Sequence, residues 1–507
     1  MAIIGELIKS AIELTDKIVK NPDPIQAQKQ VLEDLLEAAT DTAFGKHYDF
    51  EGILNSENTA KAFSQTVPVF DYDRLYNDWW YLVVEGKNDI TWPGNTPYLA
   101  LSSGTTSHSK QIPVTDDMLA AIRRSGLQQV AALANFDLPP SFFEKQILML
   151  GSSTDLKDIN GHLAGEISGI SASKIPFWFR GYYKPGKDIA SIEDFDERIK
   201  EIAKQAANWD IGSLSGIPAW MELMLKEVIS YHKLNNIHDI WPNLSVYTSG
   251  GVAFEPYKKS FEKLLAHPLV YIDTYLASEG FLAMQKRPDT SAMALVVDNG
   301  IYFEFVPFEE KNMTEEGTIA EHAEIITLTD VQEEKEYVLL ISTVAGAWRY
   351  MIGDTVMFTD ISRHEIRISG RTKHYSNVVG EQLSVIQMNA AIQEMEKQFN
   401  VCIHEFIAAT VHRGEEFVQK WYISTDKELD KIEVAKALDK TLRENNKNFN
   451  VARTRALKGV EVEPLPVETF YKWSEENKKL GGQVKIPRVM KEGQFLEWEG
   501  FVKKALH

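Results

Sequence analysis

The stretch Leu269-Val-Tyr-Ile-Asp-Thr-Tyr-Leu-Ala-Ser-Glu-Gly280 joins a short apolar segment, residues 269–272, to a polar loop that begins at Asp273. Short apolar runs of this kind favour buried strands, and amphipathic spacing favours helices. The two patterns alternate along the chain, with apolar segments at 146–150 and 338–342 and amphipathic segments at 114–135, 192–208 and 218–234. This alternation predicts an α/β fold with a largely parallel sheet. Loops after parallel strands lie at the ligand-binding edge, so the loop after 272 is a candidate site.

Other regions depart from this alternation. Residues 292–308 and 317–329 contain strand candidates with little helix between them, and they predict an antiparallel or barrel-like β subregion. Residues 365–369 alternate between polar and apolar side chains, as an edge strand does. Helical spacing also predicts amphipathic helices over 4–19 and 27–39.

The pattern changes near residue 370, where a polar stretch begins. We therefore expect a large N-terminal domain of mixed and parallel sheets with flanking helices, residues 1–370, and a smaller α/β C-terminal domain, residues 371–507. The elements predicted in the second domain are strands at 403–411 and 418–423 and a helix at 429–443.

The composition limits the classes of protein that this chain fits. It has 507 residues, of which 44% are hydrophobic, and this is enough to bury a large core. A formal net charge of −19 disfavours binding to nucleic acid or to anionic lipid. The apolar run at 292–297 is too short to span a membrane, and the N-terminus is not typical of a signal peptide. The single cysteine, Cys402, excludes an internal disulfide and a zinc ribbon. We expect a cytoplasmic protein.

A loop rich in small hydroxyl residues is the leading candidate for binding phosphate. It reads Leu101-Ser-Ser-Gly-Thr-Thr-Ser-His-Ser-Lys110. Glycine lets backbone amides approach phosphate oxygens, hydroxyls donate hydrogen bonds, and lysine offsets negative charge. Ser109 occupies the position of the second Walker glycine, so this is not a Walker loop. A Ser/Thr-rich surface turn fits the same residues.

Two later segments place polar residues beside strand candidates. In the loop after 272, Tyr275 can stack on a base, Ser278 can donate to phosphate and Glu279 can hold Mg²⁺. A helix N-cap at Ser278 is the structural alternative. In Trp348-Arg-Tyr-Met-Ile-Gly-Asp354, the carboxylate of Asp354 can accept both hydroxyls of a ribose, and a hairpin turn is the alternative.

In this order and spacing, these segments and Gly370-Arg371 resemble the acyl-adenylate-forming enzymes. Within that superfamily the chain resembles more closely the auxin-responsive acyl acid–amido synthetase family, as a bacterial-type member. The resemblance rests on the segments Ser102-Ser-Gly-Thr105, Ser278-Glu-Gly280, Tyr350 to Asp354, Gly482-Gln-Val-Lys-Ile-Pro-Arg488, Phe63-Ser-Gln-Thr-Val-Pro-Val-Phe-Asp-Tyr72 and Thr42-Ala-Phe-Gly45. It therefore covers essentially the whole chain.

The resemblance implies ATP and Mg²⁺ as cofactors, and a small carboxylic acid and an amino acid as substrates. It implies Lys485, Glu279 and Ser278 as catalytic residues, with Glu279 as the metal ligand. Gly250 and Gly251, after a strand candidate at 244–247, permit close backbone approach to the adenine. The nucleotide-binding residues are then Ser102, Ser103, Gly104, Thr105, Thr106, Lys110, Thr248, Gly250, Gly251, Tyr275, Ser278, Tyr350, Asp354 and Arg371. Residues 1–370 become an adenylation domain, and residues 371–507 a mobile domain that pivots near Gly370-Arg371.

Three functions remain open on the sequence alone: amide synthesis, coenzyme A thioester synthesis by the same adenylation step, and non-catalytic nucleotide binding. The segments 63–72 and 482–488 favour the first function. The presence of Glu279, Asp354, Arg371 and Lys485 disfavours the third. Residues 118–135 and 160–182 are the expected walls of the acid pocket. Arg123 and Arg124 there either meet a substrate carboxylate or form a solvated helix face.

Overall fold

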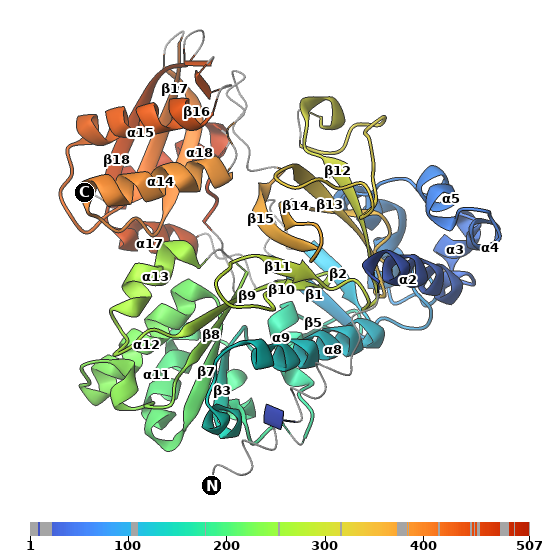
Figure 1. The fold of residues 1–507 in the computed structure, drawn as a ribbon, viewed down its shortest axis with the longest axis horizontal. Helices are drawn as coiled ribbons and strands as arrows, with labels where there is room; N and C mark the ends of the chain where they lie inside the picture. Colours follow the sequence, from blue (N-terminus) through green and yellow to red (C-terminus); the bar gives the residue numbers. More distant parts are fainter. Residues whose placement is uncertain are drawn as a thin grey trace. The chain divides into compact units, whose positions relative to one another are not determined.

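The computed structural model describes residues 9–10, 23–102, 110–177, 179–251, 254–314, 317–372, 383, 385–413, 416–446, 449–450, 452–453, 457–476, 486–490 and 492–505. The chain forms two compact units (Figure 1). The larger unit comprises Met1–Met313, Ile319–Ile352 and Met357–Arg367, and the smaller comprises Thr314–Thr318, Gly353–Val356 and Ile368–His507. None of the described helices combines the length and apolar composition that crossing a bilayer requires.

A mixed sheet organises the larger unit. In the described part of the chain its 11 strands follow the order β12-β13-β14-β15-β11-β10-β9-β8-β7-β3-β6. The strands are β3 Gln146–Leu150, β6 Tyr183–Lys184, β7 Ile211–Gly216, β8 Val246–Gly250, β9 Val270–Ala277, β10 Gly280–Met284, β11 Met293–Leu295, β12 Ile301–Pro307, β13 Glu336–Thr343, β14 Tyr350–Asp360 and β15 Glu365–Arg371. The neighbouring pairs among β6, β3, β7, β8 and β9 are parallel. Antiparallel pairing joins β9 to β10, β10 to β11, β11 to β15 and β12 to β13. The parallel half and the antiparallel subregion both confirm the sequence prediction.

A second sheet carries the two stems of the candidate phosphate loop. Its order is β2-β1-β5-β4, with β1 Tyr98–Ser102, β2 Lys110–Val114, β4 Lys157–Ile159 and β5 His162–Gly165. β1 and β2 are antiparallel, and Ser102 lies opposite Lys110. The backbone of the two residues that flank 103–109 is therefore held by the sheet.

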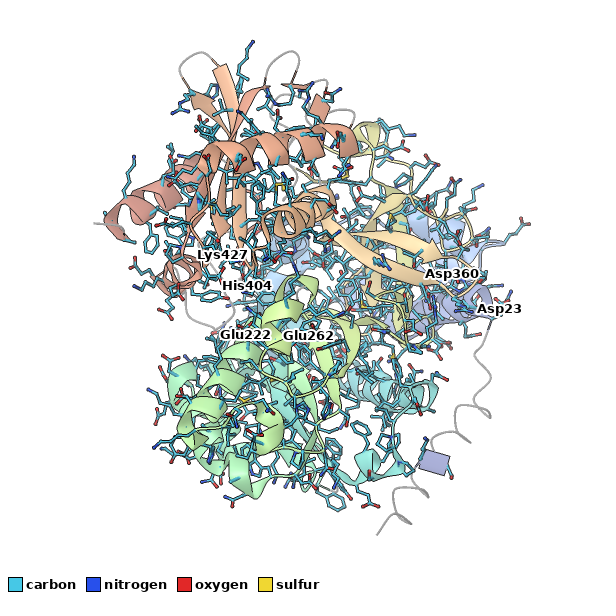
Figure 2. The ribbon with its side chains drawn as sticks, turned by 60° about the vertical axis from the view of Figure 1, so that its left-hand side comes forward. Asp23, Glu222, Glu262, Asp360, His404 and Lys427 are labelled. Carbon is cyan, nitrogen blue, oxygen red and sulfur yellow. The ribbon has the colours of Figure 1, made fainter. Side chains whose placement is uncertain are left out.

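Side-chain hydrogen bonds help to fix where helices of this unit begin and how neighbouring helices are joined. The Asp23 carboxylate, labelled in Figure 2, accepts hydrogen bonds from the first backbone amides of α2, at 2.9 and 3.0 Å. Ser260 of α13 donates to Glu222 of α12 at 2.7 Å, and this bond joins two neighbouring helices. The helices are α2 Pro24–Ala39, α3 Ala43–His47, α4 Phe50–Leu54, α5 Thr59–Thr66, α6 Tyr72–Leu75, α7 Tyr81–Val84, α8 Asp116–Ala132, α9 Ile167–Ser173, α10 Lys187–Ala190, α11 Phe195–Gln205, α12 Pro218–His232 and α13 Glu255–Glu262.

The smaller unit is a three-stranded sheet with helices on both faces. Its order is β16-β17-β18, with β16 antiparallel and β18 parallel to β17. Alternate residues of β16 enter different cores: Phe406 and Ala408 join one cluster, and Ile407 and Ala409 join another. The elements are β16 Phe406–Arg413, β17 Glu416–Ser424, β18 Leu457–Leu465, α14 Val385–Phe399, α15 Lys431–Asn445, α17 Val467–Glu476 and α18 Glu492–Ala505.

Most of the predicted elements are present, and two predictions are wrong. Residues 317–329 form no strand and make only isolated bridges, Met313 to Ile319 and Phe305 to Ile326. Residues 365–369 belong to β15, which lies between β14 and β11 and is not an edge strand. Its alternation does not follow burial, because Glu365 and Ser369 are buried and Ile368 is 41% exposed. The helix predicted at 4–19 lies largely outside the described residues.

Candidate functional site

The structure describes Ser102 and Lys110 at the two ends of the candidate phosphate loop, and residues 103–109 between them lie outside the described residues. Ser102 ends β1 and Lys110 begins β2. The Lys110 ammonium lies 4.9 Å from the centre of the Tyr72 ring. Ser103, Gly104, Thr105, Thr106 and the predicted catalytic lysine Lys485 lie outside the described residues.

The carboxyl end of β8 carries three of the predicted adenine-pocket residues. Thr248 and Gly250 belong to the strand itself, and Gly251 follows it with φ of 83°, a conformation that favours glycine. The Ser249 hydroxyl is buried near the Tyr247 hydroxyl and makes no hydrogen bond of ordinary geometry to a described residue. A buried hydroxyl beside glycine backbone at this edge fits a polar ligand.

The polar loop expected after residue 272 is largely strand. β9 continues to Ala277, so Tyr275 is a buried strand residue opposite Ala283. The alternative of a helix N-cap at Ser278 is also wrong, because Ser278 and Glu279 form the turn between β9 and β10. Antiparallel pairing with β10 satisfies the backbone of 274–277, which is why these polar residues remain in a strand.

This turn brings Glu279 to the first residue of β14. Both Glu279 and Tyr350 are buried, with 7% and 0% of their surface exposed. Burial, reinforced by the neighbouring Glu279 carboxylate, raises the pKa of Tyr350 well above its ordinary value. Within the described residues, the Tyr350 hydroxyl makes no hydrogen bond of ordinary geometry. A buried carboxylate and a buried hydroxyl from distant parts of the sequence thus meet at one place.

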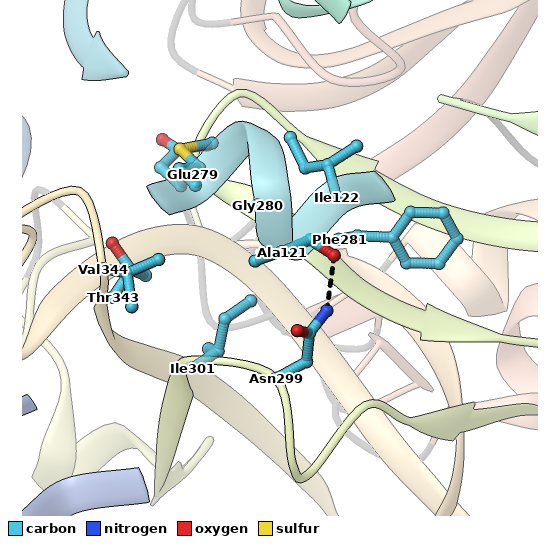
Figure 3. Close-up of a pocket in the computed structure, with 10 residues that line it drawn as sticks. Ala121, Ile122, Glu279, Gly280, Phe281, Asn299, Ile301, Thr343 and Val344 are labelled. Carbon is cyan, nitrogen blue, oxygen red and sulfur yellow. Dashed lines mark hydrogen bonds between the residues drawn. The ribbon is translucent and has the colours of Figure 1, made fainter. Parts of the chain in front are cut away.

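Glu279 also lines a small pocket beneath α8, shown in Figure 3. Asn299 closes one side, donating to the carbonyl of Ala121 at 2.6 Å and accepting from Arg124 at 2.8 Å. Both Arg123 and Arg124 are solvent-exposed, and Arg124 also contacts Asn299, which precedes β12. The lining residues are Met118, Ala121, Ile122, Glu279, Gly280, Phe281, Asn299, Ile301, Thr343 and Val344.

Asp354 and Arg371 form an ion pair in the smaller unit. Nε of Arg371 donates to Oδ1 of Asp354 at 2.8 Å, and the arginine side chain is 45% exposed. Asp354 lies within β14, so the hairpin-turn alternative is wrong. Gly353, at φ of 89°, bends the strand just before it. The carboxylate is thereby held beside a cation that solvent reaches.

Sequence reasoning missed Arg349, which precedes Tyr350. Its guanidinium binds both oxygens of Glu304, at 2.8 and 2.9 Å, and donates to the carbonyls of Ser64 and Val67, each at 2.7 Å. The signal was an arginine and a glutamate, each inside an otherwise apolar stretch, because such charges need a partner when they are buried.

The residues present fit ATP with Mg²⁺. Magnesium is held in proteins by one or two carboxylates together with phosphate oxygens, and the Glu279 carboxylate is a ligand of this type. No described residues form a group of three or more metal-binding side chains, so a metal site built entirely from protein ligands is not present in that part of the chain. The buried hydroxyls of Ser249 and Tyr350 are polar groups of a kind that a nucleotide can hydrogen-bond.

Comparison with known proteins identifies the family. Residues 12–200, 294–371 and 386–494 match the N-terminal, central and C-terminal domains of the GH3 family, in that order. "Indole-3-acetic acid-amido synthetase GH3.2" of Arabidopsis thaliana is 20% identical over 463 residues, 78% of this chain and 83% of that protein. "Jasmonoyl--L-amino acid synthetase GH3.5" of Oryza sativa subsp. japonica is 33% identical over 127 residues, 23% of this chain and 22% of that protein.

Solved structures share the fold. "GH3.15 acyl acid amido synthetase" superposes with a TM-score of 0.76 at 16% identity, over 97% of this chain and 95% of that chain. A 2-hydroxyisobutyryl-CoA ligase in its postadenylation state gives a TM-score of 0.57 at 13% identity, over 95% and 92%. The three consecutive domain matches confirm the resemblance drawn from the motifs: the chain belongs to the GH3 family.

Proposed function

We propose that this protein is a cytoplasmic, ATP-dependent and AMP-forming ligase that joins a carboxylic acid to the amino group of an amino acid. The observation that carries the proposal is the buried meeting of the Glu279 carboxylate, in the turn of the β9–β10 hairpin, with the Tyr350 hydroxyl. The names of its relatives, which are amido synthetases, support the same reaction class.

The first half-reaction activates the acid. A carboxylate resists attack by an amine because oxide is a poor leaving group. An oxygen of the acid attacks the α-phosphorus of ATP, the bond to the bridging oxygen breaks, and pyrophosphate leaves with that electron pair. The hydroxyls of Ser278, Ser102, Ser103 and Thr105 orient the phosphate oxygens, and Asp354 accepts from the ribose. When bound at Glu279, Mg²⁺ neutralises phosphate charge.

The second half-reaction forms the amide. The amino group of the acceptor attacks the carbonyl carbon of the acyl-AMP, AMP leaves, and the nitrogen loses a proton. This reaction needs no covalent enzyme intermediate. Residues 1–370 act as the adenylation domain, and residues 371–507 move between the half-reactions.

Acid-dependent exchange of pyrophosphate into ATP, screened against a panel of carboxylic acids, tests the adenylation. We expect exchange with at least one acid, and loss of that exchange in Glu279→Gln, which keeps the shape of the side chain and removes its charge. If no acid supports pyrophosphate exchange, the adenylation is contradicted and non-catalytic nucleotide binding is the function that remains. Full exchange in Glu279→Gln at limiting Mg²⁺ would remove the metal role from Glu279.

The alternative is a ligase that uses coenzyme A as the acceptor, and the likeness of this fold to the 2-hydroxyisobutyryl-CoA ligase favours it. The accepted acid and ATP are incubated with mixed amino acids in one reaction and with coenzyme A in another. Amide and AMP in the first reaction support the proposal. A thioester in the second, with no amide in the first, selects the alternative.

Lys485 is proposed as the cation that stabilises charge in the adenylation step. Losing such a group from a transition state costs about 3–4 kcal/mol, or a hundred- to a thousand-fold in rate. Lys485→Ala is therefore expected to abolish most pyrophosphate exchange while leaving amide formation from supplied acyl-AMP largely intact. An equal loss in both half-reactions would contradict this role.

A further inference from the structure

The early segment Phe63–Tyr72, which carries part of the family resemblance, contacts two strands of the candidate nucleotide site. Its first contact is with β14. The Phe70 amide donates to the Arg349 carbonyl at 3.1 Å, and the Phe70 carbonyl accepts from the Met351 amide at 2.7 Å. Phe70 therefore forms a parallel bridge with Tyr350. The start of β14 is held by backbone hydrogen bonds on both sides of Tyr350.

Two residues later, the same segment contacts β2. The Tyr72 hydroxyl accepts a hydrogen bond from the backbone amide of Gln111 at 2.8 Å. The face of its ring lies 4.9 Å from the ammonium of Lys110, a cation–π distance. Gln111 and Lys110 are the first residues of β2 after the candidate phosphate loop. Tyr72 thus holds the stem on the carboxyl side of that loop.

Further contacts keep Tyr72 in this position. Its ring packs edge-on against Trp80, with centroids 6.1 Å apart, and Trp80 lies 5.5 Å from Tyr350. The Asp71 carboxylate accepts from the Arg74 amide at 2.9 Å and starts α6 at Tyr72. Burial raises the pKa of Tyr72 to about 12, so its hydroxyl keeps its proton at neutral pH.

We propose that Phe70-Asp-Tyr72 is a brace that fixes the spacing between the stem of the phosphate loop and the start of β14, and that Tyr72 is a positioning residue for ATP. This inference rests on the proposed function. Three consecutive residues span at most about 7 Å between their outer Cα atoms, so the brace cannot stretch. ATP is bound through its phosphates and its nucleoside together. A change in this spacing therefore weakens the binding of ATP and leaves the binding of the acid unchanged.

Two substitutions separate the contacts of Tyr72, and a third serves as control. Tyr72→Phe removes the bond to Gln111 and keeps the aromatic face, and Tyr72→Leu removes both. The ring of Tyr76 stacks on that of Tyr72 at 5.6 Å, and the structure gives its hydroxyl no hydrogen bond to a described residue, so Tyr76→Phe is the matched control. We expect Tyr72→Phe to raise the KM for ATP about threefold to tenfold. Tyr72→Leu should raise it further, by about two- to fivefold.

The readouts distinguish positioning from general support of the fold. In Tyr72→Phe, the KM for the acid, the rate of amide formation from supplied acyl-AMP and the melting temperature should match those of Tyr76→Phe. An unchanged KM for ATP, or an equal loss in every readout, would overturn the brace. If the wild-type protein shows no acid-dependent exchange, the proposed function fails instead. In that case the affinity for a non-hydrolysable ATP analogue, measured by calorimetry, tests the brace. The brace requires Tyr72→Phe to bind the analogue more weakly than the wild type does.

Discussion

Arg349 and Arg371 each bind a carboxylate near one end of the Tyr350–Asp354 segment, but the two pairs lie in different surroundings. The side chains of Arg349 and Glu304 are 2% and 3% exposed, and the guanidinium makes two bonds to the carboxylate and two to backbone carbonyls. Arg371 is 45% exposed and uses Nε for its bond to Asp354. A buried guanidinium with four hydrogen bonds is suited to holding the fold. A buried carboxylate beside a half-exposed arginine leaves the cation open to a ligand.

The backbone supports this contrast. Arg349 adopts φ of 43°, a strained value for a residue with a side chain. The strain persists because the ion pair, the bond from its amide to Ser342 and the pairing of Phe70 all hold it. The position of Arg349 therefore depends on contacts with several distant segments of the larger unit.

The largest effect is expected at the buried pair. Arg349→Met leaves the Glu304 carboxylate buried without its cation, which should lower the free energy of unfolding by about 3–5 kcal/mol. Urea denaturation followed by far-UV circular dichroism measures this. Arg349→Met combined with Glu304→Leu should recover part of the loss, because no isolated charge remains. If Arg349→Met lowers the free energy of unfolding by less than about 1 kcal/mol, the buried pair stabilises the fold no more than an exposed pair does.

A change at the Asp354–Arg371 pair should act on ligand binding. Asp354→Asn removes a charged acceptor for the ribose hydroxyls, so we expect the KM for ATP to rise about ten- to a hundred-fold. Because the Asp354 carboxylate is buried and loses a charge-assisted bond, the free energy of unfolding should fall by about 1–3 kcal/mol, less than at the Arg349 pair. Steady-state kinetics and urea denaturation of the same preparation give both numbers. Unchanged affinity for ATP would remove Asp354 from the nucleotide site.

The smallest effect is expected at Arg371. Arg371→Gln leaves Asp354 in place and removes a half-exposed cation, so the KM for ATP should change by about fivefold or less. The effect should shrink as salt is raised from low to physiological ionic strength, because an exposed pair is screened. A salt-independent loss as large as that of Asp354→Asn would mean that Arg371 contacts the nucleotide itself.

Local pattern was sufficient for much of the fold. The apolar run at 146–150 predicts β3 to the residue, and the amphipathic run at 218–234 predicts α12 to within two residues at its C-terminal end. It failed where pairing with a distant strand decided the outcome. Asp273 and Thr274 have the composition of a loop, yet β9 continues through them because β8 and β10 pair with its two edges. Residues 317–329 have strand-like composition but make only isolated bridges.

The sequence by itself determined the family, the order of the motifs and the kinds of side chain that they carry. Hydrophobic periodicity, small hydroxyl residues around a glycine and carboxylates after strand candidates are properties of neighbouring residues, and neighbours in sequence remain neighbours in the fold. Only the tertiary structure decided that Glu279 meets Tyr350, that Tyr72 holds β2 and that Arg349 is buried against Glu304. Burial and partner choice depend on which distant segments the sheet brings together, and no local pattern contains that information.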